Sequence, residues 1–397
     1  MNNAISKALS RRSSSFLLPL GIVLIGANLR APITALGPVL DRIQADLALG
    51  DTTASLLSAL PLLIFALLSL VAPAFGRRFG LERSLAFALV AILIGTLIRS
   101  CPLSGGLWIG TLLLSCGIAV GNVLLPGLVK RAFPEHATLY IGVYAAAMAS
   151  AASLAAGLAA PVADLPGSNW RIAIALGAVI TAAAILVWLP QLRRPHHAVA
   201  SRANASHAVS PWRHPIGWQV SSFFAFQSFV FYSLITWYAA MSAARGESAT
   251  ASGFDLLLYQ VVAVATNLLS APLIKRTKDQ RAIGLVCGAS LLAGTIGLGV
   301  AAPFPALWLA IAGLGAGFSM TTSLSLFALR TRHHDEAAKL SGMAQFVGYA
   351  GAAPGPVLTG MLHGVTGSWT ASLAMLVGAS ALVTVFAVLS GRDRLID

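Results

Sequence analysis

A positively charged side chain stands in the middle of the first long apolar stretch of the chain. Residues 27–38 read ANLRAPITALGP, with Arg30 near the centre of the stretch. An arginine at the centre of a membrane helix costs roughly 2.5–3.5 kcal/mol, so it must face a partner or a water-filled cavity. Its planar fork of N–H donors suits oxyanions, which predicts that Arg30 binds an anionic or electronegative ligand. The alternative is that Arg30 ties a kinked helix to its neighbours.

The surroundings of Arg30 provide hydrogen-bond acceptors but no counter-ion. Every acidic residue falls in a loop, in a tail or near the end of an apolar stretch. Pro32 frees the backbone carbonyl of Asn28, and Pro38 frees that of Thr34, which predicts a kinked helix. Thr34 shares the helix face of Arg30, whereas Asn28 lies about 200° away. We therefore expect Thr34 beside the ligand and expect Asn28 to bond a neighbouring helix, while keeping its amide as a candidate ligand contact.

The composition excludes an ordinary soluble domain. Of the 397 residues, 57% are hydrophobic and 10% are charged, whereas soluble proteins carry about 25% charged residues. The net charge of +13 comes from small basic clusters between apolar stretches. This is the pattern of cytoplasmic membrane loops rather than of a nucleic-acid-binding surface.

Twelve apolar stretches are long enough to cross a membrane as helices. We take the first as an uncleaved span, because its apolar run continues without a signal-peptide cleavage site. The expected spans are 16–41, 53–76, 84–101, 107–129, 137–161, 171–190, 216–241, 252–274, 282–302, 307–329, 338–362 and 369–390.

The distribution of Lys and Arg predicts the topology. With the N-terminus inside, 21 of the 26 basic residues fall in cytoplasmic segments. Four belong to outer segments (Arg42, Arg99, Arg171 and Arg245), and Arg30 is the one left over. This bias predicts that both termini are cytoplasmic.

The longest polar interval divides the chain into two halves. We expect an N-terminal six-helix bundle over 1–190, a cytoplasmic linker over 191–215 and a C-terminal six-helix bundle over 216–397. A faint repeat at an offset of 199–200 residues supports this division, as when Trp170 matches Trp369. Two parallel six-helix repeats around a central site form the major facilitator fold, an all-α integral membrane architecture.

Four motifs carry a family resemblance: NLRAPITALGP (28–38), RRFGLERS (77–84), GNVLLPGLVKRAFP (121–134) and LSGMAQFVGYAGAAPGP (340–356). With them the chain resembles the cyanate permease and 2-nitroimidazole transporter branch of the major facilitator superfamily. The resemblance implies twelve helices, transport of a small solute and a cavity lined by spans 1, 4, 7 and 10. One departure is Arg77, which stands where the superfamily usually carries an Asp.

The resemblance and the expected depths add further candidate residues. Substrate contacts are expected from Asn122 in the fourth span, Gln227, Tyr232 and Trp237 in the seventh, Thr322 in the tenth, and Gln345 and Tyr349 in the eleventh. Each has an ordinary alternative, because buried amides bond neighbouring helices and aromatic residues anchor span ends. The basic turn after the second span is expected to act in conformational change through Arg77, Arg78, Gly80 and Arg83.

These observations predict a secondary transporter working by alternating access in the inner (cytoplasmic) membrane. Its substrate would be a cyanate-like anion or a nitroimidazole-like compound, and export of drugs or small heterocycles is the alternative. A membrane-embedded enzyme is the rival of another class, but seven of the eight histidines fall in loops and no catalytic motif is present.

Cofactors, metals and nucleic acid are not expected. The expected partners are a small-molecule substrate and the lipid bilayer, with the chain acting as a monomer. We also expect no proton carrier at the membrane centre, because no Asp, Glu or His lies near mid-depth in any span. Asp41, Asp255 and His363, near the outer ends of spans, are the reserve candidates.

Overall fold

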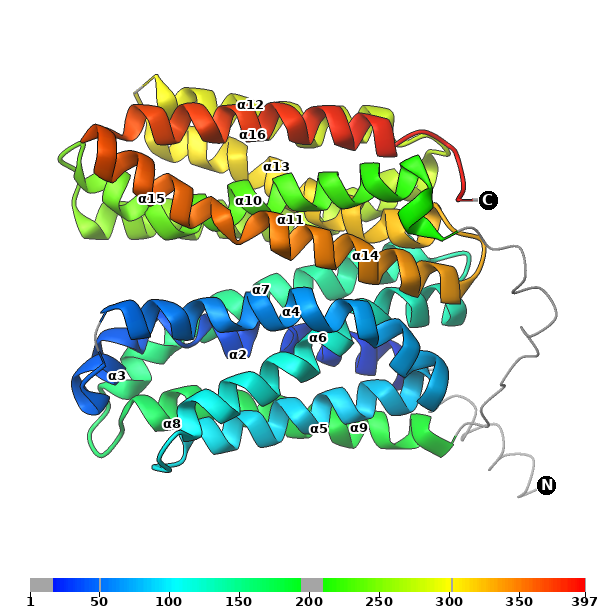
Figure 1. The fold of residues 1–397 in the computed structure, drawn as a ribbon, viewed down its shortest axis with the longest axis horizontal. Coiled ribbons are helices and arrows are strands. Elements are labelled where there is room, and N and C mark those ends of the chain that lie inside the picture. Colours follow the sequence, from blue (N-terminus) through cyan, green and yellow to red (C-terminus); the bar gives the residue numbers. More distant parts are fainter. Residues whose placement is uncertain (1–16, 50, 194–209, 301–302, 397) are drawn as a thin grey trace. The chain divides into compact units, whose positions relative to one another are not determined.

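The computed structural model describes residues 17–49, 51–193, 210–300 and 303–396. Within these ranges every regular element is a helix. After a first helix over 17–28, the elements are α2 (Ala31–Thr34), η1 (Gly37–Val39), α3 (Leu40–Leu47), α4 (Asp51–Phe79), α5 (Leu81–Ser100), α6 (Gly106–Ala132), α7 (Ala137–Ala163), α8 (Trp170–Ala175), α9 (Gly177–Trp188) and η2 (Leu189–Arg193). The second part of the chain continues with η3 (Pro211–Arg213), α10 (Pro215–Ala243), α11 (Ala249–Arg276), α12 (Arg281–Gly299), α13 (Pro305–Leu329), α14 (His334–Ala352), α15 (Pro354–Thr366) and α16 (Trp369–Ser390) (Figure 1).

The helices confirm the predicted all-α membrane fold. In the described part of the chain, eleven segments are long and apolar enough to cross a membrane. The remaining expected span, 338–362, is divided between α14 and α15 at Ala353. Pro354 and Pro356 follow this break, and proline lacks the N–H group that would continue the helical hydrogen bonds. The two pieces together cover the expected eleventh span.

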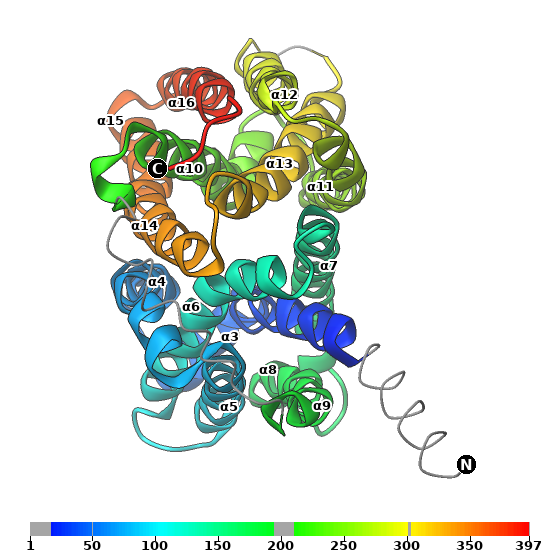
Figure 2. The same ribbon diagram turned by 90° about the vertical axis from the view of Figure 1, so that its right-hand side faces the viewer.

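The chain forms two compact units. The first contains Met1–Val129 and Ala147–His207, and the second contains Lys130–Ala146 and Ala208–Asp397. In the second unit α11 packs along α13, α12 packs along α13 and α16, and α10 packs along α14 and α16 (Figure 2). Most of the expected linker, residues 194–209, lies outside the described residues.

Small residues let helix backbones approach closely inside each unit. A Cβ atom added to Gly117 on α6 would lie 2.4 Å from the carbonyl oxygen of Ala88 on α5. In the second unit, a Cβ added to Gly317 on α13 would lie 2.3 Å from the carbonyl oxygen of Ala263 on α11. Such contacts favour helix association in lipid, where apolar side chains gain little by leaving the acyl chains.

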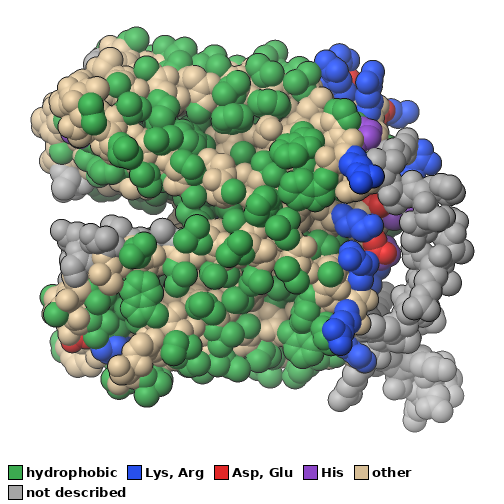
Figure 3. Space-filling model, in the orientation of Figure 1, with side chains coloured by type: hydrophobic (Ala, Val, Ile, Leu, Met, Phe, Trp, Pro, Cys, Tyr) green, Lys and Arg blue, Asp and Glu red, His purple; other side chains and the backbone are tan. Residues whose placement is uncertain are grey.

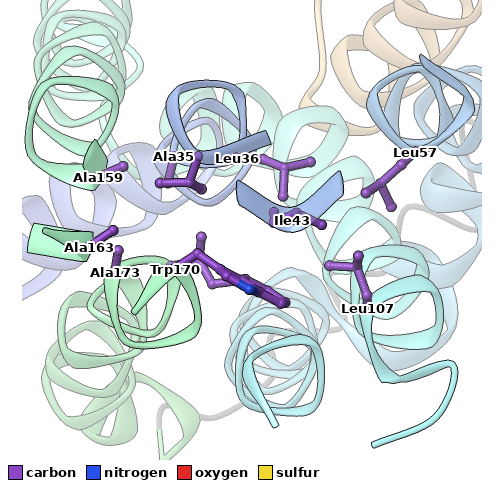
Figure 4. Close-up of a cluster of buried hydrophobic side chains, with 11 residues drawn as sticks. Ala35, Leu36, Ile43, Leu57, Leu107, Ala159, Ala163, Trp170 and Ala173 are labelled. Carbon is purple, nitrogen blue, oxygen red and sulfur yellow. The ribbon is translucent and has the colours of Figure 1, made fainter. Parts of the chain in front are cut away.

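Trp170 lies in a cluster of buried apolar side chains in the first unit (Figure 4). Its neighbours come from α3, α4, α6 and α7 and include Ile43, Leu57, Leu107 and Ala159. The helix α8 begins at Trp170 because the side-chain oxygen of the preceding Asn169 caps its first N–H groups. The cluster therefore fixes α8 against the helices that surround it.

Charged side chains lie mainly at one end of each unit. Lys and Arg gather where α4, α6 and α11 finish, while the sides are largely apolar (Figure 3). Arg99, which the sequence analysis counts with the outer segments, is buried. It lies inside α5, in the last turn, with only 1% of its surface exposed. The helix continues to Ser100, so the guanidinium group is packed into the unit instead of reaching water.

Candidate functional site

The first span is broken at the position where the two prolines predicted a kink. The helix over 17–28 ends, residues 29 and 30 form a turn, and the four-residue α2 begins at Ala31. Arg30 is the N-cap of α2, with φ −137° and ψ −36°, outside the helical region. Pro32 occupies the first turn of α2, where its missing N–H group is tolerated. The structure therefore confirms that Arg30 lies at an interruption of the helix.

Arg30 is half-buried at this break. Its backbone carbonyl oxygen accepts hydrogen bonds from the N–H groups of Ile33 at 3.0 Å and Thr34 at 3.2 Å. The backbone of Arg30 is therefore held by hydrogen bonds from α2, although Arg30 itself is not helical. Irregular backbone at membrane depth is tolerated where it is buried in protein or lines a water-filled cavity. An arginine presented there can donate several hydrogen bonds to a small anion or a nitro group.

Thr34 and Asn28 both make hydrogen bonds to other helices of the first unit. The Thr34 hydroxyl donates to the carbonyl oxygen of Ala152 on α7 at 2.9 Å. The Asn28 Nδ2 donates to the carbonyl oxygen of Leu24 at 2.8 Å, and its Oδ1 accepts from the Thr181 hydroxyl at 2.5 Å. The interhelix bond expected of Asn28 is present, and the bond of Thr34 adds a second fixed point beside Arg30.

The fourth span meets the first beside the break. A Cβ added to Gly121 on α6 would lie 2.5 Å from the Cδ2 atom of Leu29. Leu29 directly precedes Arg30, and Gly121 directly precedes Asn122, which is half-buried. The structure therefore brings the segments that carry Arg30 and Asn122 into contact within the first unit.

In the second unit, α10 and α14 carry amide and aromatic side chains on facing surfaces. The rings of Phe224 and Tyr349 meet edge to face with centroids 5.6 Å apart. Gln227 follows Phe224 by three residues and Gln345 precedes Tyr349 by four, so each shares a helix face with one of these rings. Both amides are buried, and their Nε2 atoms donate to Ser228 at 2.9 Å and to Ser341 at 2.8 Å. We call Gln227, Gln345 and Tyr349 the amide patch.

The other candidates of the second unit lie on different surfaces. Trp237 donates from Nε1 to the carbonyl oxygen of Pro356 at 2.7 Å, and so ties α10 to α15. Thr322 is directed toward α12, where its hydroxyl oxygen lies 3.8 Å from the Sγ atom of Cys287. Tyr232 is half-buried and packs edge to face on Phe231, with ring centroids 5.3 Å apart.

The basic turn after the second span has the tight geometry that the sequence predicted. Only Gly80 separates α4 from α5, and its backbone adopts φ 84° and ψ 154°. This region is open essentially to glycine alone. Arg77, Arg78 and Arg83 are all exposed around the turn.

Sequence reasoning missed one charged group next to the break. The Nη2 atom of the buried Arg99 donates to the carbonyl oxygen of Pro32 at 2.6 Å. Pro32 lies two residues after Arg30, so a second arginine contacts the same short segment. The burial of Arg99 could have been suspected from the sequence, because Arg99 lies within the apolar run of the third span and the fourth span contains small residues that allow close packing.

The helices of the described residues are those of a multi-pass membrane protein. The family model of the Major Facilitator Superfamily matches residues 20–356, and the chain belongs to this superfamily. The superfamily consists of transporters, which confirms the expectation that the protein is not an enzyme.

Curated relatives lie in the branch that the motifs predicted. The chain is 38% identical over 374 residues to the 2-nitroimidazole transporter of Escherichia coli (strain K12), covering 94% of this chain and 95% of the relative. It is also 38% identical over 389 residues to the uncharacterized transporter YycB of Bacillus subtilis (strain 168), covering 98% and 96%. The cyanate transport protein CynX of E. coli (strain K12) is 27% identical over 350 residues, covering 88% and 90%.

The fold also matches solved structures of the superfamily. The proton:xylose symporter XylE bound to 6-bromo-6-deoxy-D-glucose superposes with a TM-score of 0.73 at 13% identity, covering 96% of this chain and 97% of that one. At this level of identity the match concerns the fold alone.

Proposed function

We propose that the protein moves a small anionic or strongly electronegative solute across the cytoplasmic membrane, with Arg30 as its main substrate-binding residue. The observation that carries this proposal is the placement of Arg30 at a break in the first span. Relatives that transport 2-nitroimidazole or cyanate support the size and polarity of the solute. A guanidinium group can donate to the oxygen atoms of a nitro group as well as to an anion.

The contacts around Arg30 support a substrate site on the first unit. Thr34 donates to the Ala152 carbonyl, and Leu29 packs on Gly121, the residue before Asn122, so the segment that carries Arg30 is fixed on both sides. We include Thr34 and Asn122 as substrate contacts, with Asn28 as a supporting residue. On the second unit we assign the amide patch to the substrate, because it combines buried amides with an aromatic ring. Tyr232, Trp237 and Thr322 complete the proposed contact set.

The proposed mechanism is alternating access, in which bundles 1–190 and 216–397 rock about a central site while the cytoplasmic linker 191–215 joins them. Basic residues at one end of each unit support an inner-membrane protein with both termini in the cytoplasm. The working form is a monomer in the lipid bilayer. Export of small heterocycles is the second candidate, because the 2-nitroimidazole transporter is 38% identical to this chain.

The test of the Arg30 assignment uses purified protein in liposomes and a panel of solutes that includes cyanate and 2-nitroimidazole, assayed for uptake and efflux. Arg30→Ala should lower transport by about tenfold or more, because one hydrogen bond to a charged group contributes about 1.5–3 kcal/mol. Arg30→Lys should also impair transport, because lysine lacks the planar fork. The matched control is Arg245→Lys, a change at the outer end of the second unit. Full transport by a well-folded Arg30→Ala variant would refute the assignment.

The access mechanism has its own test. Spin labels placed at the cytoplasmic ends of α4 and α11 should give at least two distance populations whose proportions change with substrate. A single distance that stays unchanged with and without substrate, under conditions of active transport, would count against alternating access.

A further inference from the structure

Arg99 is a buried cation whose described contacts include no acidic side chain. It lies in the last turn of α5 with 1% of its surface exposed, and its Nη2 atom donates to the Pro32 carbonyl oxygen at 2.6 Å. Among the described residues its Nε atom has no hydrogen-bond partner. A buried positive charge without a carboxylate is costly, so its place beside the broken helix calls for an explanation.

The Pro32 carbonyl oxygen needs a hydrogen-bond donor that its own helix does not supply. In a continuous helix the N–H group of Leu36 would bond to it. In the structure the N–H group of Leu36 bonds instead to the carbonyl oxygen of Ile33 at 3.2 Å, because α2 ends at Thr34. Arg99 provides the missing donor, which is also the favourable arrangement of a cation at the carboxyl end of a helix.

The backbone around Arg99 is held closely by α6. A Cβ added to Gly110 would lie 2.4 Å from the backbone nitrogen of Arg99, and one added to Gly95 would lie 2.5 Å from that of Leu114. The two helices therefore touch through their backbones at the level of Arg99, which fixes the origin of its side chain. The same helix α6 contacts Leu29 through Gly121 on the other side of Arg30.

Three contacts thus hold the residues that flank Arg30 in the sequence. Leu29 packs on α6. The Pro32 carbonyl oxygen accepts a hydrogen bond from Arg99 on α5. The Thr34 hydroxyl donates to the carbonyl oxygen of Ala152 on α7. Consecutive Cα atoms are 3.8 Å apart, so the backbone of Arg30 lies within about 8 Å of that of Pro32. Any movement of the Pro32 carbonyl therefore changes the direction in which the Arg30 side chain leaves the chain.

We propose that Arg99 is a positioning residue for the substrate site, acting through the Pro32 carbonyl to hold the break in the form that presents Arg30. The inference rests on the proposed function, in which Arg30 binds the solute.

The test is a double-mutant cycle in the full-length protein reconstituted in liposomes, with labelled cyanate and 2-nitroimidazole as probes. Arg99→Gln should raise KM about tenfold or more, the effect of losing one hydrogen bond from a charged donor. The Arg30→Ala, Arg99→Gln double variant should transport no worse than Arg30→Ala alone, because Arg99 acts through Arg30. Arg99→Lys, which keeps a charged donor, should restore most of the lost affinity.

The matched control is Arg42→Gln. Arg42 also donates to a backbone carbonyl of the first unit, that of Ala160 at 3.2 Å, but lies away from the break. The Arg42→Gln variant should have the KM of the wild type. If Arg99 has only a structural role, its variants will yield less folded protein with a wild-type KM, and this result would overturn the inference. Additive losses in the cycle would overturn it as well. Full activity of Arg30→Ala would instead refute the proposed function, which separates the two failures.

Discussion

Thr181 on α9 donates its hydroxyl hydrogen to the Oδ1 atom of Asn28, across 2.5 Å in space and 153 residues in sequence. Both side chains are buried, with exposed fractions of 0% and 2%. The bond joins the helix just before the break to the sixth span. It therefore holds the first half of the broken span in place while α2 is held by other contacts.

Thr181→Val should destabilise the protein without abolishing transport. The substitution keeps the shape of the side chain but removes the donor to Asn28, and interhelix hydrogen bonds in membrane proteins contribute about 0.6 kcal/mol on average, up to about 1.7. Thermal unfolding in detergent should show a lowered midpoint for Thr181→Val and a nearly unchanged one for Thr181→Ser. Equal midpoints for wild type and the valine variant would contradict the prediction.

Gly80→Ala should destabilise the turn between α4 and α5. The conformation of φ 84° and ψ 154° is almost closed to residues with a Cβ atom, and forcing one into it costs about 1–3 kcal/mol. The matched control is Gly378→Ala on α16, where an added Cβ meets nothing within 4 Å and the backbone is helical. The control should be neutral or slightly stabilising. The unfolding midpoint should fall for Gly80→Ala and stay the same or rise for Gly378→Ala. A Gly80→Ala protein as stable as wild type would disprove the strain argument.

Arg330→Met should release the C-terminal segment. Arg330 is 1% exposed and donates to the carbonyl oxygens of Ser390 and Gly391, each at 2.9 Å. Its own carbonyl oxygen accepts from the N–H group of Ile396 at 2.9 Å. Removing the guanidinium leaves the buried Ser390 carbonyl without this donor, while the Gly391 carbonyl keeps the N–H group of Gln280 at 2.8 Å. We therefore expect a loss of about 1–3 kcal/mol in stability. Hydrogen exchange after Ser390 should accelerate in this variant and not in the exposed control Arg332→Met; unchanged exchange in both would contradict it.

A pH gradient should not drive accumulation of a substrate whose pKa lies far from the working pH. The reserve carboxylate Asp255 accepts a hydrogen bond from the buried Tyr238, an interhelix contact that fits a structural role. His363 stacks on Trp369 with ring centroids 3.8 Å apart. The side chain of Asp41, the third reserve candidate, lies outside those described.

The measurement imposes a pH gradient on proteoliposomes at zero membrane potential. Asp255→Asn keeps an acceptor for Tyr238 and should transport like wild type. Uphill accumulation that disappears in Asp255→Asn would refute the prediction and identify the proton carrier.

The sequence by itself determined the helices, the membrane class and the place of the break. Apolar length defines a span, and the effect of Pro32 on helical hydrogen bonds is confined to one turn, so neither needs knowledge of distant residues. The turn at Gly80 could be predicted for the same reason. The four family motifs identified the superfamily before any geometry was known.

Only the tertiary structure decided which polar groups meet. Arg99 is 67 residues from Pro32, and Thr181 is 153 residues from Asn28, so no local pattern could pair them. Thr322 was a candidate by depth alone, and packing directs it toward Cys287 on α12. The physical reason is that the partner of a buried polar group depends on which helices lie side by side and at what rotation. Small residues such as Gly110 set that rotation by allowing backbone contact, and their effect becomes visible only when both helices are in place.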